Sequence, residues 1–138
     1  MPRKPLLIFL LTLFLTVLQI QWASPADGYD AESLSILSPE ALGAWPGVLL
    51  LFLQAVFARR QVPVLRQASL CTGMLAVYWL LANYITFDAR VASWSTYSAL
   101  EIWMHVLPAS VVSITLCGAA WFGATWLILR QAGAKKSR

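Results

Sequence analysis

The sequence predicts an all-α integral membrane protein, a bundle of four transmembrane helices with both ends of the chain in the cytoplasm. Three observations predict this fold class. Of the 138 residues, 59% are hydrophobic and only 12% are charged, whereas charged residues make up roughly a quarter of an average soluble domain. The apolar residues are grouped in four long stretches, and basic and acidic residues alternate in the segments between them. This small number of charged residues cannot provide the surface of a water-soluble domain. Lipid must therefore solvate the chain.

Each apolar stretch is long enough for a spanning helix, which needs roughly 17 to 25 residues. None of the four contains Asp, Glu, Lys or Arg, and none shows the strict alternation of a barrel strand. In hydrocarbon only helices and closed barrels satisfy their own backbone groups, so helices are expected. The predicted spans, all in a single membrane domain of residues 1–138, are Pro5–Trp22, Ala41–Ala58, Ala68–Phe87 and Val106–Leu129.

The charges between the spans predict the orientation. Nine of the ten basic residues precede the first span, separate the second from the third, or follow the fourth, and all six acidic residues lie in the other two segments. The positive-inside rule therefore places both termini in the cytoplasm and leaves external loops at residues 23–40 and 88–105. The residues taken as cytoplasmic topology determinants are Arg59, Arg60, Arg66, Lys135 and Lys136.

Two questions stay open at this point. Arg3 and Lys4, followed by an apolar run and the small residues Ser24 and Ala26, also resemble a signal peptide cleaved after Ala26. Against cleavage, the apolar run extends through Trp22 and is longer than the roughly 7 to 15 apolar residues at the centre of a typical signal peptide.

The compartment is the second question. A bacterial inner membrane is the first expectation, and the terminal sequence KKSR, which fits a dilysine retrieval signal, makes the endoplasmic reticulum membrane the alternative.

The two external loops differ in character. The first contains several Pro, Gly and Ser residues, so we expect irregular structure with a short surface helix at residues 31–37. In the second, apolar and aromatic residues recur every three or four positions from Val91 to Leu107, which indicates a helix in the interface or an extension of the fourth span. Pro46 and Pro108 are expected in first turns, where a missing amide proton costs little.

Four polar residues near the predicted outer ends of the spans are candidates for a binding site: Gln19, Asn83, Glu101 and His105. Glu101 and His105 are four residues apart, so on a helix they share a face, where a carboxylate can orient or charge an imidazole. Such a pair could relay protons, bind a cation or contact a lipid headgroup. The structural alternative is that Glu101 and His105 are hydrated interfacial residues and that Gln19 and Asn83 pair with neighbouring helices or headgroups.

The fourth span carries small residues at four-residue spacing, which favours close packing of helices in lipid. They form two lines, one of Ala109, Ser113 and Cys117 and one of Ala120 and Ala124. Cys117 and the chain's other cysteine, Cys71, show no metal-ligand spacing and are expected at different depths, so we predict neither a disulfide nor a metal site.

Most catalytic patterns are missing from the sequence. It has no GxSxG, no HExxH, no phosphate-binding glycine loop and no second histidine for haem ligation. The absence of charge within the spans argues against a proton-coupled pump. We therefore assign no catalytic residue and expect no cofactor.

The sequence favours a non-catalytic accessory or assembly subunit of a larger membrane complex. Its expected partners are membrane lipids and another membrane protein or a second copy, and no nucleic acid, because no basic patch is interleaved with aromatic residues. The alternative is a small oligomeric transporter or lipid-handling protein that uses the outer polar cluster. An intramembrane enzyme based on Glu101 and His105 is a third possibility.

Overall fold

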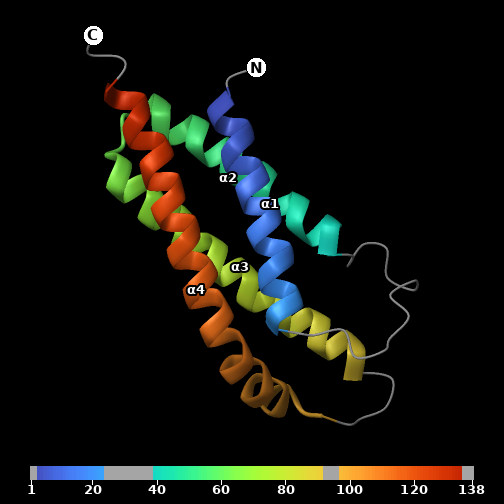
Figure 1. Cartoon of the computed structure of the whole chain (residues 1–138). Coiled ribbons are helices and arrows are strands. Elements are labelled where there is room, and N and C mark those ends of the chain that lie inside the picture. The colour runs from blue at the N-terminus through green and yellow to red at the C-terminus, as the bar shows by residue number, and fades with distance from the viewer. Residues whose placement is uncertain (1–2, 24–38, 92–96, 135–138) are drawn as a thin grey trace.

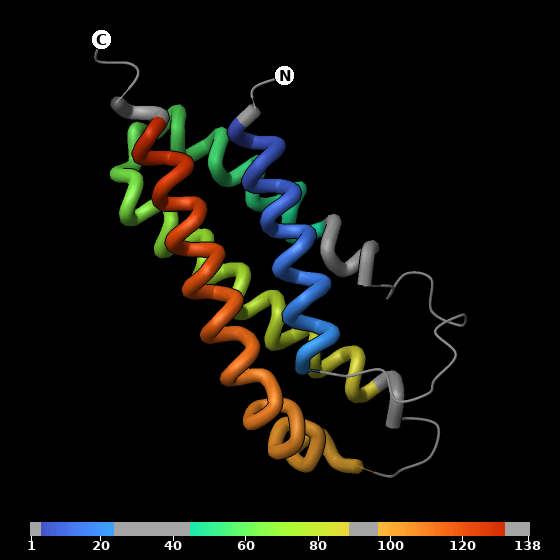
Figure 2. The backbone as a smooth tube through the Cα atoms, viewed as in Figure 1, coloured from blue at the N-terminus to red at the C-terminus, as the bar shows by residue number. Residues whose placement is uncertain are grey.

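Four long helices form the protein. The computed structural model describes the backbone of residues 3–23, 39–91 and 97–134, and the side chains of residues 4–23, 45–88 and 97–131. Within these ranges there are four helices and no strand, as Figure 1 shows: α1 (Arg3–Ala23), α2 (Pro39–Arg59), α3 (Val64–Val91) and α4 (Ala99–Ala134). The predicted all-α fold is confirmed. The start of α1, the turn from α2 to α3 and the end of α4 lie at the same end of the molecule (Figure 2).

Three of the helices are long and apolar enough to cross a membrane, at Lys4–Ala23, Val64–Asp88 and Ala99–Gln131. The 36 residues of α4 extend about 54 Å at 1.5 Å per residue, which exceeds the roughly 30 Å of a hydrocarbon core. The predicted second span at residues 41–58 is helical, but its described apolar part, Trp45–Arg59, is shorter than a full span. By length and composition the protein is therefore a membrane-embedded helical bundle.

The helices extend beyond the predicted spans. Residues 88–91 continue α3, and α4 begins at Ala99, so the fourth helix extends beyond the span predicted at residues 106–129, which was one of the two alternatives for the segment 88–105. Pro46 and Pro108 consequently lie inside α2 and α4 and not in their first turns. A capping interaction between Ser98 and Glu101 explains the start of α4. Residues 24–38 and 92–96 lie outside the described residues, and with them the short helix expected at residues 31–37.

The connection between α2 and α3 is a tight turn. The amide of Val62 donates to the carbonyl of Phe57 (3.1 Å), and the amide of Gln61 donates to that of Ala58 (3.3 Å). This pair of bonds is the Schellman arrangement, which requires a left-handed residue just beyond the helix. Gln61 takes that role with a φ of 52°, and Pro63 follows, which favours termination of α2. The turn holds Arg59, at the end of α2, near the start of α3.

Packing in the bundle is uneven. α3 packs mainly against α4, α1 packs mainly against α2, and α1 also contacts α4. Where α1 meets α2 the approach is close, because a Cβ atom built on Gly47 would lie 2.8 Å from the ring of Phe9. The main core contains Trp79, Trp121 and the two cysteines, which are free thiols. Of the small residues on α4, Ser113 and Cys117 are buried, whereas Ala109 and Ala120 are exposed.

Candidate functional site

A seam of hydrogen-bonded polar side chains runs through the interior between α1, α3 and α4. We call it the polar seam. Every member is at most 3% exposed, and in a low-dielectric interior an unpaired polar group is costly, so such groups tend to find partners on neighbouring helices. The members are Thr12, Thr16 and Gln19 of α1, Trp79 and Asn83 of α3, and Ser110, Ser113 and Trp121 of α4.

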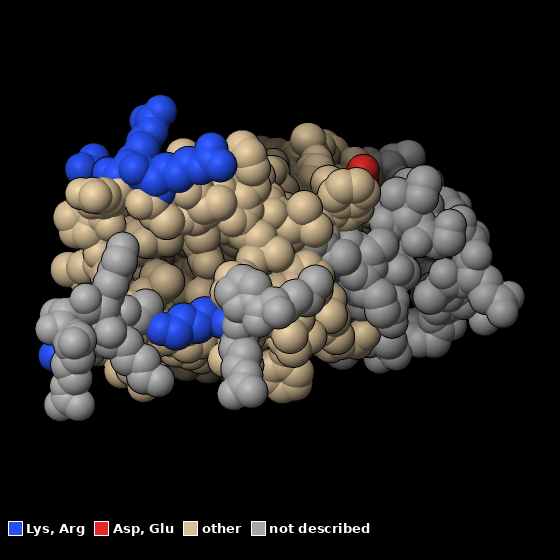
Figure 3. Space-filling view, turned by 90° about the horizontal axis from the view of Figure 1, so that it is seen from above, with Lys and Arg blue, Asp and Glu red and all other residues tan. Residues whose placement is uncertain are grey.

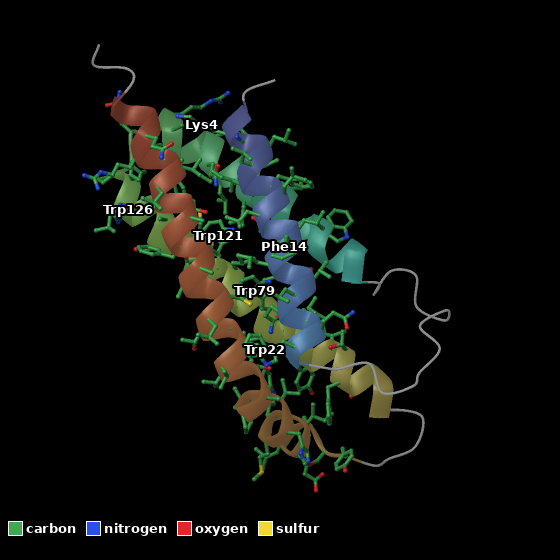
Figure 4. The ribbon with its side chains drawn as sticks, in the orientation of Figure 1. Lys4, Phe14, Trp22, Trp79, Trp121 and Trp126 are labelled. Atoms are coloured by element: carbon green, nitrogen blue, oxygen red, sulfur yellow. The ribbon has the colours of Figure 1, made fainter. Side chains whose placement is uncertain are left out.

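Two tryptophans form the part of the seam nearest the start of α1. The indole nitrogen of Trp121 donates to the hydroxyl of Thr12 (2.9 Å), and that hydroxyl donates to the carbonyl of Ile8 one turn earlier (2.7 Å). The indole nitrogen of Trp79 donates to the hydroxyl of Thr16 (2.9 Å). Figure 4 shows Trp121 and Trp79 at successive levels between the ends of α1 that are marked by Lys4 and Trp22. Both indoles are thus fully buried with their N–H groups paired.

Two amides form the other part of the seam. The side-chain nitrogen of Gln19 donates to the hydroxyl of Ser113 (3.3 Å), and that of Asn83 donates to the hydroxyl of Ser110 (2.9 Å). Ser113 in turn donates to the carbonyl of Ser110 (3.1 Å). The structure therefore brings Gln19 and Asn83, two of the predicted site residues, to adjacent positions on one face of α4.

Each of these amides has one group without a protein partner. The oxygens Oε1 of Gln19 and Oδ1 of Asn83 are buried and unpaired. The same holds for Nε2 of Gln54 and the hydroxyl of Thr125, which lie five residues before the basic residues Arg59 and Arg130. Unpaired buried polar atoms are uncommon in folded proteins and call for an explanation.

The other two predicted site residues lie apart from the seam, on the exposed first turns of α4. Glu101 forms a capping box with Ser98: its carboxylate accepts from the Ser98 amide (2.7 Å) and hydroxyl (2.8 Å), and its own amide donates to that hydroxyl (3.4 Å). This reciprocal pairing satisfies amides that a helix start leaves free. The bonds from the Ser98 amide and then its hydroxyl hold the pKa of Glu101 below the ordinary 4.5, and His105 adds a smaller lowering.

His105 contacts two aromatic rings, one from α3 and one from the segment just before α4. It stacks on Phe87 with ring centroids 5.9 Å apart and meets the edge of Tyr97 at 5.7 Å. Tyr84 of α3 and Trp103 of α4 pack against each other, with ring centroids 4.6 Å apart. The imidazole is exposed, so this aromatic group can contact lipid headgroups, as interfacial aromatic residues commonly do. The four predicted residues therefore form two groups, an interior one and a surface one.

Sequence reasoning did not identify the hydroxyl and indole members of the seam. A signal for them exists, because Thr12, Thr16 and Gln19 are spaced by four and three residues and so share one face of a helix. Ser110, Ser113, Cys117 and Trp121 follow the same rule on α4. These spacings predict a shared face, but they do not indicate which helix it meets.

Basic side chains gather at the end of the bundle opposite Glu101. Figure 3 shows the described Lys and Arg residues toward the left of the view and an acidic residue farther right. At this end Arg130 lies over the ring of Trp126, 5.2 Å from its centroid. Lys135 and Lys136 lie outside the described residues. The described Lys and Arg side chains at this end are Lys4, Arg59, Arg60, Arg66 and Arg130.

Among the described residues no group of three or more His, Cys, Asp or Glu side chains could hold a metal ion. The polar groups of the polar seam are amides, hydroxyls and indoles, which bind by hydrogen bonding.

Known proteins give no further guide to the site: no protein family matches the chain, and no curated protein or solved structure is significantly similar to it.

Proposed function

We propose that this chain is a non-catalytic accessory or assembly subunit of a larger membrane complex. Its location is a bacterial inner membrane, with both ends of the chain in the cytoplasm. The endoplasmic reticulum membrane is the alternative location. The partners are membrane lipids and another membrane protein or a second copy of the chain.

The observation that carries this proposal is that the side chains of the polar seam bond to one another across the helices. Trp79 and Trp121 fill the bundle interior, and their N–H groups are bonded to threonines of α1. A substrate path needs polar groups that are free to exchange partners with the substrate. The seam instead uses its indoles and most of its hydroxyls to hold three helices together, so recognition is left to the outer surface.

That outer surface offers large apolar side chains on every helix. Examples with about half or more of their surface exposed are Phe14, Phe52, Val77 and Leu116, one from each of the four helices. In a membrane such a surface meets lipid or another helix, and van der Waals fit decides between them. The location is supported by the basic side chains at one end of the bundle, since cytoplasmic segments carry an excess of Lys and Arg.

A second candidate function is supported by the aromatic group around His105. An exposed imidazole between Phe87 and Tyr97, with Glu101 one turn away, is suited to contact a lipid headgroup. On this reading the chain is a small oligomeric transporter or a lipid-handling protein that acts at the outer face.

Site-specific photo-crosslinking in cells distinguishes the two functions. A photoreactive amino acid is placed in turn at Phe14, Phe52, Val77 and Leu116, and the adducts are identified by mass spectrometry after purification in mild detergent. We expect one or two positions to yield a defined protein adduct of constant mass, while the others yield lipid.

Lipid adducts alone at all four positions would contradict the subunit proposal. A lipid retained through purification and lost in His105→Ala would favour the second function. Because the four positions lie on different helices of the same bundle, each serves as the control for the others.

A further inference from the structure

The two amides of the polar seam lie at the same level of the bundle. The Thr16–Trp79 bond sets the register of α1 against α3, and three residues further along each helix Gln19 is level with Ala82, the neighbour of Asn83. Ile20 and Ala82 pack together in a buried cluster at this level. On α4, Ser110 and Ser113 are three residues apart and so share a face. Gln19, Asn83, Ser110 and Ser113 thus converge from three helices.

The hydrogen-bonding capacity left unused at this level can be counted. Ser113 gives its proton to the carbonyl of Ser110, so its oxygen can only accept, and the amide of Gln19 must present nitrogen to it. That orientation leaves the Gln19 oxygen as an unpaired acceptor. The Asn83 oxygen is a second unpaired acceptor. Ser110 accepts from Asn83 and keeps its own hydroxyl proton to donate.

Two acceptors and one donor match the capacity of a single water molecule. Water donates two protons and accepts at least one, and buried waters typically make about three hydrogen bonds. A bare cation fits less well, because the four residues are buried and offer no carboxylate, and a buried charge without a counter-charge is costly. A water also fits if the side-chain amide of Asn83 is turned over, with its nitrogen and oxygen exchanged. The water then accepts a hydrogen bond from the Asn83 nitrogen where it would otherwise donate one to the Asn83 oxygen.

We propose that Gln19, Asn83 and Ser110 bind one water molecule, which joins α1, α3 and α4 at the end of the polar seam remote from the basic side chains. At the Trp79 and Trp121 levels both indoles are fully buried and their N–H groups are paired with threonines, so neither indole has a donor left for water. The water adds a bridge between α1 and α3, whose side chains are linked directly through Thr16 and Trp79. This site is independent of whether the chain acts as a subunit or as a lipid-handling protein.

Water-edited solid-state NMR of the full chain in lipid bilayers tests the site. Magnetisation is transferred from water to nitrogen-bound protons, and the side-chain amides of Gln19 and Asn83 are assigned by loss of their signals in Gln19→Met and Asn83→Leu. We expect rapid transfer to both amides and slow transfer to the indole N–H groups of Trp79 and Trp121, which are equally buried. Transfer to the amides as slow as to the indoles would overturn the proposal.

Unfolding in detergent gives a second test. Each single substitution, Gln19→Met or Asn83→Leu, is expected to raise the unfolding equilibrium constant about tenfold, because it strands the groups on the other side of the water. The double variant should raise it by clearly less than the product of the two, since both lose the same water. Independent, multiplicative effects would contradict a shared water.

The same measurement with sodium and with potassium at constant ionic strength addresses the competing ligand. The water site predicts equal stability in the two salts. A wild-type protein that is stabilised by one cation, with the effect absent in Asn83→Leu, would show that the site binds that ion and would overturn the water proposal.

Discussion

Thr12 has a second role beyond the bond that most helical threonines make. Its hydroxyl donates to the carbonyl of Ile8, and it also accepts the indole proton of Trp121 from across the bundle. Thr115 makes the first kind of bond alone, to Val111 (2.7 Å), and is exposed. Comparing the two threonines therefore separates the contribution of the inter-helix hydrogen bond to stability from that of the local bond within the helix.

We predict that Thr12→Val lowers the free energy of unfolding by about 1 to 3 kcal/mol, because the buried indole N–H of Trp121 is left without a partner. Thr115→Val, the matched control, should change it by less than about 0.5 kcal/mol. Denaturant titration in detergent micelles measures both. Adding Trp121→Phe to Thr12→Val removes the stranded donor, so the double variant should lose less than the sum of the single losses. Strict additivity would refute the bond.

Glu101 illustrates how a residue predicted for chemistry takes a structural position. Its carboxylate accepts two hydrogen bonds from Ser98, which favour the ionised form and lower its pKa. The stabilisation of the helix start is therefore present at neutral pH and is lost as the pH falls through this lowered pKa. The sign follows from the ionised carboxylate being the acceptor in both bonds.

We predict that the amide proton resonance of Ser98 titrates with a midpoint below pH 4.5, the ordinary pKa of a glutamic acid side chain. In Glu101→Gln the titration should disappear, and the first turn of α4 should exchange its amide protons faster. An unchanged resonance in Glu101→Gln would show that the capping box does not form in the bilayer. The variant should accumulate normally in the membrane, since the group lies on the surface.

At the scale of helices, the α1–α2 contact depends on a glycine. A Cβ atom at Gly47 would lie 2.8 Å from two ring atoms of Phe9, whereas a Cβ atom at Gly73 on α3 would meet nothing within 4 Å. Both glycines are inside helices, where alanine is intrinsically favoured by up to about 1 kcal/mol. A difference in stability between Gly47→Ala and Gly73→Ala therefore reflects side-chain packing alone.

We predict that Gly73→Ala raises the free energy of unfolding by up to about 1 kcal/mol. Gly47→Ala should lower it by about 1 kcal/mol, because the Phe9 ring must leave its place between the helices. Thermal unfolding in the same detergent compares the variants, and Phe9→Leu should rescue Gly47→Ala by making room. Equal stabilisation by both alanines would mean that α2 lies farther from α1 than the structure indicates.

For the whole molecule, α1 is part of the core and so bears on the signal-peptide alternative. Ile8 and Leu15 belong to the main buried cluster, and the threonines of α1 pair with both buried tryptophans. Cleavage after Ala26 would remove these partners and leave two indole N–H groups unpaired in the bundle. We therefore predict that mass spectrometry of the purified protein detects residues 3–23 of α1 as part of the mature chain. A mature chain that begins at Asp27 would show that three helices suffice.

Orientation in the membrane is the second property of the whole chain to test. Cysteine introduced at Ser33 or Ser95 should react with a membrane-impermeant thiol reagent in intact cells, and cysteine at Gln61 or Ser137 should react only after lysis. The native cysteines provide a low background, since Cys71 and Cys117 are buried. Labelling at Gln61 from outside would reverse the predicted orientation.

The sequence by itself determined the fold class and the four long helices of the described residues, because both depend on local quantities. A stretch of apolar residues without charge must form a helix in lipid whatever its neighbours are. The capping box at Ser98 and Glu101 was also readable from the sequence, as a serine followed three residues later by a glutamate. It marks the helix start one residue before Ala99, seven residues ahead of the predicted membrane span at Val106, in agreement with an extension of the fourth span.

Only the tertiary structure decided which polar residues meet. Gln19 and Ser113 are 94 residues apart in the chain, and Thr12 and Trp121 are 109 apart. Whether such residues pair depends on the rotation of each helix about its axis and on its sliding against the others. In lipid the rotation and the sliding are set by side-chain packing across the whole bundle. Hydrophobicity does not fix them, because an apolar helix face is as stable against lipid tails as against another helix. For this reason the four polar residues that the sequence grouped by depth were divided by the bundle into an interior pair and a surface pair.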